Sequence, residues 1–396
     1  MTVCTNTNNA LFFSSVTEIT DQTWTELNCN KSIYFNPKYL FSLEKNNPQI
    51  DFSYLVLLDK HQKAIAFATI QVLDIPIDIL ENSIENGFEK LKCFSRKIFF
   101  PKKKTLKILV CGNTFVSGEH GIYIQPNQDK KKVVRALAKA LQHFANSNEI
   151  SKKNISAFIL KDFIKESLII TDELHKHNYY SFNVEPNMLL EVNENWYTFD
   201  DYLASMKTKF RVKARKAMKQ SIRLKVIDIT SENIEELLPK MTHLYQTVAI
   251  NSDFNLGEFN LNTYKSFKEN LGDNYILQTY WLEHKIVGFL SGIINQKTLD
   301  AHFVGIDYKL NRECAIYQRM LYDYIIIGID KKIERINFGR TASEIKSSVG
   351  AIPQDLTVYL RHKKSITNRL LKLFLQKIEP TPFNQKFPFK TEKKEH

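Results

Sequence analysis

The chain has 396 residues, 43% hydrophobic and 25% charged, and this composition argues against global disorder and allows one or two buried cores. Its first residues lack the basic and apolar segments of a signal peptide, and no stretch reaches the roughly 20 apolar residues of a membrane span. The formal charge of +12 is concentrated in residues 207–225, with nine Lys/Arg and no acid, and residues 361–396, with ten Lys/Arg and three acids. Each segment must face solvent or an anionic partner.

The five cysteines form no C-x-x-C pair, and their number is odd. This pattern argues against a disulfide scaffold and against a zinc ribbon. We interpret them as buried thiols in a reducing compartment, and we expect no metal site. The expected location is the cytoplasm, either free or peripheral at the inner face of the plasma membrane. The cysteines are Cys4, Cys29, Cys93, Cys111 and Cys314.

The N-terminal half, residues 1–193, alternates between strand and helix patterns. An apolar and basic insertion at about residues 74–104 interrupts the alternation. Expected strands cover residues 52–58, 64–72, 106–111, 156–161 and 181–192, and expected helices cover residues 37–45, 131–146 and 163–175.

One long helix is expected between the two halves. Thr198 or Asp200 can cap its first turn by accepting a hydrogen bond from a backbone N–H. Apolar residues then recur every three or four positions and form one buried stripe, while the basic residues occupy the other faces. The stripe consists of Leu203, Met206, Phe210, Ala214 and Ala217.

The C-terminal half has a clearer pattern, in the order β-α-α-β-β-β-α-β-α-β. Expected strands cover residues 222–230, 275–283, 285–295, 298–307, 335–338 and 356–362, and expected helices cover residues 231–251, 261–271, 313–331 and 343–348. The short links between the middle strands predict an antiparallel meander within an α/β sheet of mixed direction.

Three segments carry a resemblance to a known group of proteins. They are residues 199–216 (FDDYLASMKTKFRVKARK), 313–324 (ECAIYQRMLYDY) and 336–350 (INFGRTASEIKSSVG). The first resembles the pattern F-x-x-Y-L-x-S-L-x-x-K-x-R-x-x-x-R-K, and the third resembles D-F-G-R-G-x-x-x-x-K-x-x-x-G. Both patterns are typical of duplicated GNAT-like acyltransferases of the FemAB-like and BioF2-like families.

The resemblance implies an α/β fold made of tandem GNAT-like folds, with mixed central sheets flanked by helices. Residues 1–193 would form the first fold, and residues 194–364 would form the second, which carries the active centre. Residues 365–396 would form a basic amphipathic tail. Members of these families transfer acyl groups from thioesters, or amino acids from aminoacyl-tRNA, to amines. No cofactor is expected to stay bound, because acyl-CoA or acyl carrier protein acts as co-substrate.

Amine acylation needs a base, a stabiliser of the oxyanion and a proton donor for the leaving group. His302, in the middle of a strand, and Glu344, at a helix start, compete for the role of base. Tyr317 is a candidate proton donor. Each residue also has a purely structural interpretation. His302 would make one hydrogen bond, the carboxylate of Glu344 would be favoured by the helix dipole, and the ring of Tyr317 would pack in the core.

Arg340 follows a strand and a glycine. At such a position a guanidinium can hold a carboxylate or phosphate with two hydrogen bonds. The structural alternative is a salt bridge that ties the strand to a helix. Lys346 and Gln318 are further candidates for substrate binding. The usual glycine-rich phosphate loop of GNAT enzymes is absent from residues 307–314. The donor phosphates would therefore meet the start of the helix expected at residue 313. This site would consist of Asn311, Arg312, Glu313 and Cys314.

In the N-terminal half, residues 111–121 contain three glycines without the spacing of a phosphate loop. They form either a bulged connection between strands or one wall of an acceptor cleft. In the second case Asn113, Glu119 and His120 would contact the substrate, and residues 161–163 would line the same cleft.

We therefore expect an N-acyltransferase that acylates an amphiphilic amine in envelope lipid synthesis, such as that of sphingolipid-like or amino-acid lipids. Residues 207–225 and the C-terminal tail would face an anionic membrane, and no specific nucleic acid is expected. One alternative is an aminoacyl-tRNA dependent transferase of peptidoglycan synthesis, with tRNA as partner. Another is a GNAT-like binding protein without catalysis.

Overall fold

The computed structural model describes residues 9–76, 105–146, 155–250 and 257–390, and its contacts divide the chain into two units. Unit 1 contains residues 1–184, 253–260 and 355–380, and unit 2 contains residues 185–252, 261–354 and 381–396. Strands β7 (Tyr180–Glu191) and β13 (Ile352–His362) each begin in one unit and end in the other. From residue 77 on, the expected insertion lies outside the described residues.

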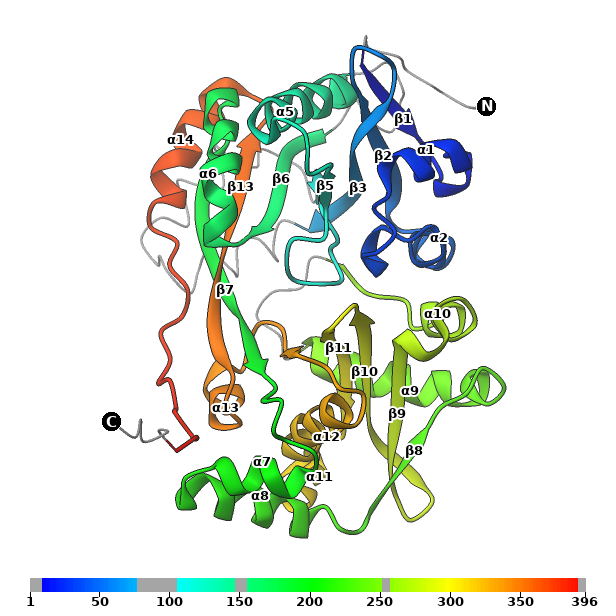
Figure 1. The fold of residues 1–396 in the computed structure, drawn as a ribbon, viewed down its shortest axis with the longest axis vertical. Helices are drawn as coiled ribbons and strands as arrows, with labels where there is room; N and C mark the ends of the chain where they lie inside the picture. The colour runs from blue at the N-terminus through cyan, green and yellow to red at the C-terminus, as the bar shows by residue number, and fades with distance from the viewer. Residues whose placement is uncertain (1–8, 77–104, 147–154, 251–256, 391–396) are drawn as a thin grey trace. The chain divides into compact units, whose positions relative to one another are not determined.

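Unit 1 has the strand order β1-β2-β3-β4-β6-β13, and β5 pairs with β3 (Figure 1). β4 and β6 run parallel to each other. Its further strands are β1 (Ala10–Phe13), β2 (Asp51–Leu58), β3 (Ala64–Pro76), β4 (Thr105–Cys111), β5 (Ile122–Ile124) and β6 (Ile155–Phe163). Its helices are α1 (Asp21–Leu27), α2 (Pro37–Asn46), α5 (Lys130–Asn146), α6 (Leu168–Thr171) and α14 (Ser365–Leu375), with 3-10 turns η1 (Val16–Glu18), η2 (Ile33–Phe35), η3 (Lys165–Ser167) and η4 (Asp172–His177).

Helices cover both faces of the unit 1 sheet. Neighbouring side chains of a strand point to opposite faces, so β3 contacts both helical layers. Ala66 and Ala68 of β3 belong to the core that includes the buried face of α5. Phe67, between them, packs against Trp24 of α1, with ring centroids 5.1 Å apart. The core of unit 1 therefore has two layers, one on each side of the sheet.

Unit 2 has the strand order β7-β12-β11-β10-β9-β8. Its strands are β8 (Leu224–Asp228), β9 (Tyr275–Leu282), β10 (Lys285–Asn295), β11 (Thr298–Ile306) and β12 (Arg335–Asn337), besides part of β7. Its helices are α7 (Phe199–Ser205), α8 (Thr208–Gln220), α9 (Ile234–Ile250), α10 (Thr263–Leu271), α11 (Tyr308–Cys314), α12 (Ile316–Asp330) and α13 (Ser343–Ser348), with the 3-10 turn η5 (Gly272–Asn274). The expected antiparallel meander is confirmed as β9, β10 and β11.

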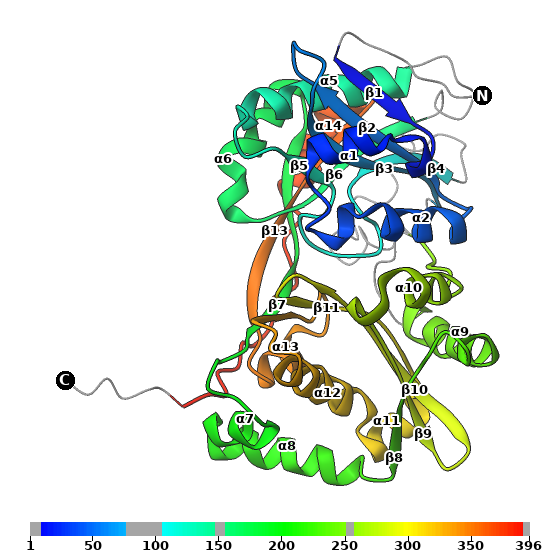
Figure 2. The same cartoon turned by 45° about the vertical axis from the view of Figure 1, so that its right-hand side comes forward.

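Helices α9 and α10 lie on one face of the unit 2 sheet and α12 on the other (Figure 2). Two glycines allow this close packing. A Cβ atom at Gly288 would stand 2.6 Å from the Met320 side chain of α12, and one at Gly305 would stand 2.8 Å from Leu244 of α9. Among the described residues no helix is long and apolar enough to cross a membrane.

Three expected helices differ from the structure. The long helix after Thr198 is two helices, because Met206 is extended and forms an isolated β-bridge with Phe389. Thr198 is its cap, in a capping box with Asp201. In the helix expected at residues 163–175, Phe163 ends β6, and the remainder is a series of short helical pieces, η3, α6 and η4, in place of one helix. The helix expected from residue 313 begins at Ile316, because Ala315 has a left-handed backbone that separates α11 from α12.

The C-terminal region is also not one amphipathic tail. α14 belongs to unit 1, whereas residues 381–390 form an extended segment of unit 2, which we call the C-terminal strap. Sequence periodicity detects the helix but not the strap, because an extended segment held by long-range contacts has no helical pattern of its own.

Candidate active site

The central parallel strands of unit 2 separate after three residues. β11 and β12 are in register from the pair Thr298/Arg335 to the pair Asp300/Asn337. At the last pair, Asn337 Nδ2 donates a hydrogen bond to Asp300 Oδ1 at 2.9 Å. β11 then continues to Ile306, whereas β12 ends. The two chain segments diverge here and form what we call the unit 2 fork.

The other neighbour of β11 loses register at the same place. The β10–β11 ladder shifts between Leu290 and Gly292, so Ser291 lies opposite two residues, His302 and Phe303. Such a β-bulge bends a strand and interrupts its ladder. The backbone groups of His302 and Phe303 therefore lie outside the regular pairing on both sides of β11, where a strand can present amides to a substrate.

Ser291 organises the polar contacts beside His302. Its Oγ donates to the Phe303 carbonyl at 2.8 Å and lies 2.9 Å from the Tyr264 hydroxyl and 3.4 Å from His302 Nδ1. Tyr324 donates to the Ser291 carbonyl at 2.6 Å. Because the one Ser291 proton goes to Phe303, the other groups must donate to Ser291.

The imidazole of His302 lies among aromatic rings. The centroids of Phe303, Tyr264 and Phe267 are 4.3, 6.0 and 6.3 Å from that of the imidazole. The residue is half-buried, but its Nε2 is fully buried. Burial lowers the pKa of His302 to about 3, because an imidazolium would lose its hydration there. His302 is therefore neutral across the physiological pH range.

The second arm of the fork is a tight loop that begins at Gly339. This glycine has φ +71°, and Thr341 and Ala342 have φ +64° and +49°, a backbone region that costs free energy for residues with a side chain. The Gly339 N–H donates to Asn337 Oδ1 at 2.9 Å, and the Gly339 carbonyl accepts from the Met188 N–H at 3.1 Å. The loop is thus attached to both neighbouring strands.

Lys346 of α13 holds this loop from within. Its Nζ donates to the carbonyls of Arg340 at 2.6 Å and Gly339 at 3.3 Å. Lys346 is 4% exposed, and burial lowers its pKa to about 7. Its ammonium group is thus used to position the loop, although the sequence suggested contact with substrate. Arg340 is half-buried, and burial lowers its pKa to about 10, so its guanidinium stays charged at neutral pH.

Glu344 lies on the outer side of α13 and is bound to the C-terminal strap. Its carboxylate pairs with Lys386 Nζ at 2.9 Å, and its side chain is 58% exposed. The Lys386 N–H also donates to Ser347 Oγ at 3.1 Å. The two candidate bases therefore differ: Glu344 is ion-paired and exposed, whereas His302 lies at the fork.

The strap continues over Gly350, the last residue of the segment that carries the family resemblance. Gly350 has φ +105°, and a Cβ atom there would stand 2.3 Å from the Phe389 ring. The Phe389 ring also packs against Trp196 and Tyr202, with centroids 5.4 and 5.9 Å apart. Gly350 therefore provides the flat surface on which the strap is anchored.

The donor-binding residues expected near residue 313 occupy a different position from the predicted one. Asn311, Arg312, Glu313 and Cys314 belong to the last turns of α11, so the amides of residues 313 and 314 do not begin a helix. Asn311 Oδ1 instead accepts the Tyr317 N–H at 2.9 Å and caps the first turn of α12. Arg312 and Glu313 are exposed, and Cys314 is buried.

Tyr317 and Gln318 lie in the first turn of α12. Gln318 is exposed, and Tyr317 is half-buried with a pKa raised by burial of its ring, so the phenol stays protonated. A protonated phenol can donate a proton to a leaving group.

The candidate residues of unit 1 form an internal network. Lys161, at the end of the parallel pair β4–β6, donates to the carbonyls of Asn113 at 2.6 Å and Val116 at 2.8 Å. It also pairs with Asp162 at 2.8 Å, and Asp162 accepts the Gly118 N–H at 3.2 Å. Lys161 and Asp162 are 8% and 0% exposed. This buried ion pair stabilises the loop after β4.

Asn113, Glu119 and His120 also serve this loop. Asn113 donates to the Tyr39 hydroxyl at 2.7 Å, and Glu119 accepts the Ile164 N–H at 2.8 Å. His120 stacks on Tyr34, with centroids 3.9 Å apart, and burial lowers its pKa to about 3. Burial also raises the pKa of Glu119. The structure brings these residues together, around contacts within the protein.

The two units share a detail that the sequence does not reveal. In unit 1 the last parallel pair is Cys111/Leu160, and in unit 2 it is Asp300/Asn337. Two residues beyond each pair the backbone turns left-handed, at Asp162 with φ +72° and at Gly339 with φ +71°. A buried lysine holds the neighbouring loop in both units. This agreement supports a duplicated architecture.

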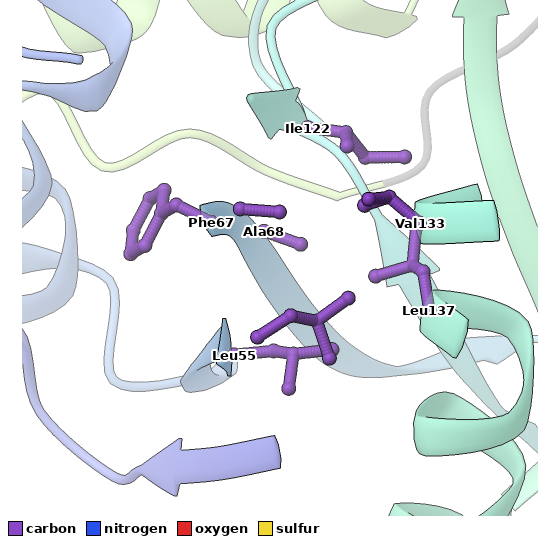
Figure 3. A pocket seen from close by; sticks show the side chains of 8 residues that line it. Leu55, Phe67, Ala68, Ile122, Val133 and Leu137 are labelled. Atoms are coloured by element: carbon purple, nitrogen blue, oxygen red, sulfur yellow. The ribbon is translucent and has the colours of Figure 1, made fainter. Parts of the chain in front are cut away.

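Unit 1 also contains an apolar pocket where α5 crosses the sheet (Figure 3). It is too narrow for a water molecule, and the side chains that line it are hydrocarbon. In this conformation it belongs to the packed core. It is lined by Leu55, Leu57, Ala66, Phe67, Ala68, Ile122, Val133 and Leu137.

Ser291 and Tyr264 are the polar neighbours of His302 that sequence reasoning missed. Ser291 is a single polar residue in an apolar strand between Gly288 and Gly292, and this interruption was a usable signal for a bulge. Tyr264 had no local signal, because its contact with Ser291 joins residues far apart in the chain.

The family model of FemAB-like proteins, described as peptidoglycan biosynthesis/recognition, matches residues 99–386. No curated protein matches the sequence. Three solved structures share the fold. FemX has 11% identity and a TM-score of 0.53 over 89% of this chain and 99% of FemX. A tandem GNAT protein from the clavulanic acid biosynthesis pathway has 7% identity and a TM-score of 0.54 over 89% and 98% of the two chains.

The third structure is the C-terminal domain of a candidate lysylphosphatidylglycerol synthetase from Agrobacterium fabrum. It has 9% identity and a TM-score of 0.50 over 89% of this chain and 95% of that domain. These similarities confirm the predicted α/β fold with tandem GNAT-like architecture.

Proposed function

The chain belongs to the FemAB-like family, and we propose that it is an N-acyltransferase that moves an acyl group from a thioester to an amine. The family supports a transferase of acyl or aminoacyl groups in envelope biosynthesis, and the fold is shared with FemX and a tandem GNAT protein. The observation that carries the finer proposal is the unit 2 fork, where a neutral His302 and the Arg340 loop flank the Asp300–Asn337 hydrogen bond.

The reaction needs few groups. The lone pair of the acceptor amine attacks the thioester carbonyl carbon, and a tetrahedral oxyanion forms. Backbone amides of β11 beside the bulge stabilise the oxyanion. His302 is our candidate base for the proton that the attacking nitrogen loses. The C–S bond then breaks, and the thiolate takes a proton, for which the Tyr317 hydroxyl is our candidate donor.

Arg340 would bind an anionic part of a substrate. Its guanidinium can hold a phosphate or carboxylate with two hydrogen bonds, and Lys346 fixes the backbone that carries it. The donor would be acyl-CoA or acyl carrier protein. The exposed Arg312 and Gln318, at the α11–α12 junction, remain our candidates for contacts with it. The acceptor would be an amphiphilic amine, as in sphingolipid-like or amino-acid lipids.

Purified protein tests this proposal directly. Incubation with long-chain acyl-CoA and an amino-alcohol lipid should release free thiol and form an amide detectable by mass spectrometry. Arg340→Gln should raise the KM of one substrate, and His302→Ala should lower kcat, while Gln22→Ala, in an exposed turn of α1, should change neither. Unchanged activity in both site variants would refute the assignment of the site.

The family description favours a second candidate, an aminoacyl-tRNA dependent transferase that acts on a peptidoglycan precursor. A deletion strain distinguishes the two functions. Loss of an N-acylated lipid with unchanged muropeptides supports the lipid acyltransferase. Altered muropeptides with unchanged lipids would support the tRNA-dependent reaction instead.

A further inference from the structure

α14 is anchored to unit 1 by one face. Thr367, Asn368 and Leu375 are buried on that face. The Asn368 side chain donates to the Asn178 carbonyl at 2.9 Å and accepts the His362 N–H at 2.7 Å. Because these contacts fix the rotation of the helix, they also determine which residues face outward.

The outward face of α14 is apolar and basic. Ile366 and Leu373, two helical turns apart, are 78% and 60% exposed, and the half-buried Leu370 lies between them. Arg369 is exposed beside this row. Just past the helix end, Ile378 is 40% exposed and follows the exposed Lys377. Water is an unfavourable environment for such a row of branched aliphatic side chains.

Basic residues predominate in the sequence around this face, up to the exposed Glu379 that follows it. Residues 356–378 contain six Lys/Arg and no Asp or Glu. Hydrocarbon side chains flanked by cations match the boundary between acyl chains and anionic headgroups. RNA is a poorer fit. Its phosphates could bind the cations, but it offers no apolar phase for Ile366 and Leu373, and single-stranded RNA is usually bound by stacking of its bases on aromatic side chains.

We propose that the outward face of α14 docks the protein on an anionic lipid bilayer. Ile366, Leu370 and Leu373 enter the headgroup boundary, and Arg369 and Lys377 contact lipid phosphates. The inference rests on the helix itself and is independent of the reaction proposed above. It assigns the membrane contact of the C-terminal region to this one face.

The test is co-sedimentation of the full chain with vesicles of phosphatidylglycerol and phosphatidylcholine in equal parts, and of phosphatidylcholine alone. Binding should require phosphatidylglycerol and weaken as salt is raised. The double variant Ile366→Ser, Leu373→Ser should partition roughly tenfold more weakly. Arg369→Gln with Lys377→Gln should weaken binding roughly 25-fold, because each basic residue near an anionic surface contributes about fivefold.

Ile169→Ser is the matched control, because Ile169 of α6 is 70% exposed but lies outside the basic segment, with Glu166 three positions before it and Glu173 four positions after it in the sequence. It should bind as the unchanged protein does. Because the altered side chains are exposed, each variant should keep its melting temperature. Equal binding to both kinds of vesicle, or full binding by the Ile366/Leu373 variant, would overturn the proposal. So would loss of binding only in Lys213→Gln with Lys216→Gln on α8.

Discussion

The Nζ atom of Lys346 lies 2.6 Å from the carbonyl oxygen of Arg340 and donates a hydrogen bond to it. The lysine acts on its neighbour through the backbone carbonyl and not through the guanidinium of Arg340. This contact makes two measurable quantities depend on one buried amine: the stability of unit 2 and the geometry of the Arg340 loop.

Replacement of Lys346 by Met should remove a pH dependence of stability. The unfolded lysine stays protonated to about pH 10, whereas burial lowers the pKa of Lys346 to about 7 in the folded protein. Between these values the unfolded state binds more protons, so stability rises with pH. Urea unfolding should show that this lysine contributes a gain of about 2 kcal/mol from pH 7 to pH 9, absent in Lys346→Met.

Lys386→Met is the control for Lys346→Met, because Lys386 is ion-paired at the surface and the change should keep the pH dependence. If acyl transfer is observed, Lys346→Met should lower kcat/KM roughly tenfold to a hundredfold through misplacement of Arg340. An unchanged pH dependence in Lys346→Met would show that the buried amine is not the titrating group.

His302 should make the protein sensitive to acid. Its pKa is about 3 in the folded protein and about 6.5 when unfolded, so below pH 6.5 the unfolded state binds the extra proton and stability falls. At pH 5 the free energy of unfolding is lowered by about 2 kcal/mol, and His302→Gln should abolish this loss. The comparison is chemical denaturation at pH 7 and pH 5.

The His302 imidazole should leave no inflection near pH 6.5 in the pH profile of the rate, because in the folded protein it is neutral both above and below that pH. His120→Gln in unit 1 is a useful parallel. The pKa of His120 is also lowered to about 3, so its replacement should reduce acid sensitivity without altering turnover. A rate inflection near pH 6.5 that disappears in His302→Gln would contradict the buried, neutral imidazole.

Gly350 and Phe389 should be strongly coupled. Gly350→Ala places a methyl group against the Phe389 ring and forces alanine into φ +105°, so we expect a loss of about 2–4 kcal/mol in the free energy of unfolding. In Gly350→Ala with Phe389→Ala the steric part disappears. The double variant should therefore be less destabilised than the sum of the two single variants, by about 1–2 kcal/mol. Additive effects would mean that the ring does not pack on this glycine.

Neutralising the acid of the buried Lys161–Asp162 pair should destabilise the protein much more than neutralising the acid of an exposed pair. Asp162→Asn leaves the Lys161 charge buried without its counterion, and we expect a loss of about 3–5 kcal/mol, measured by urea denaturation. Arg335 and Glu191 form the matched exposed pair, and Glu191→Gln should cost less than about 1 kcal/mol. Equal costs in the two variants would show that the Lys161–Asp162 pair is hydrated.

Much of the secondary structure of unit 2 was predictable because its signals are local. The meander strands alternate over short links, and the capping box at Thr198 needs only residues 198–201. The break at Met206 was not predictable, because its cause is a β-bridge to Phe389 almost two hundred positions away. Local propensity favoured one helix, and a long-range contact divided it.

The amino-acid sequence by itself determined the α/β class, the family and the residues that flank the fork, because periodicity and the 336–350 segment are properties of neighbouring positions. Only the tertiary structure decided their roles. The bulge at Ser291 places His302 among aromatic rings, burial keeps it neutral, and the strap pairs Lys386 with Glu344. Strand register, burial and long-range contact set the pKa and hydrogen-bond partners of a side chain, and these arise only when distant segments pack together.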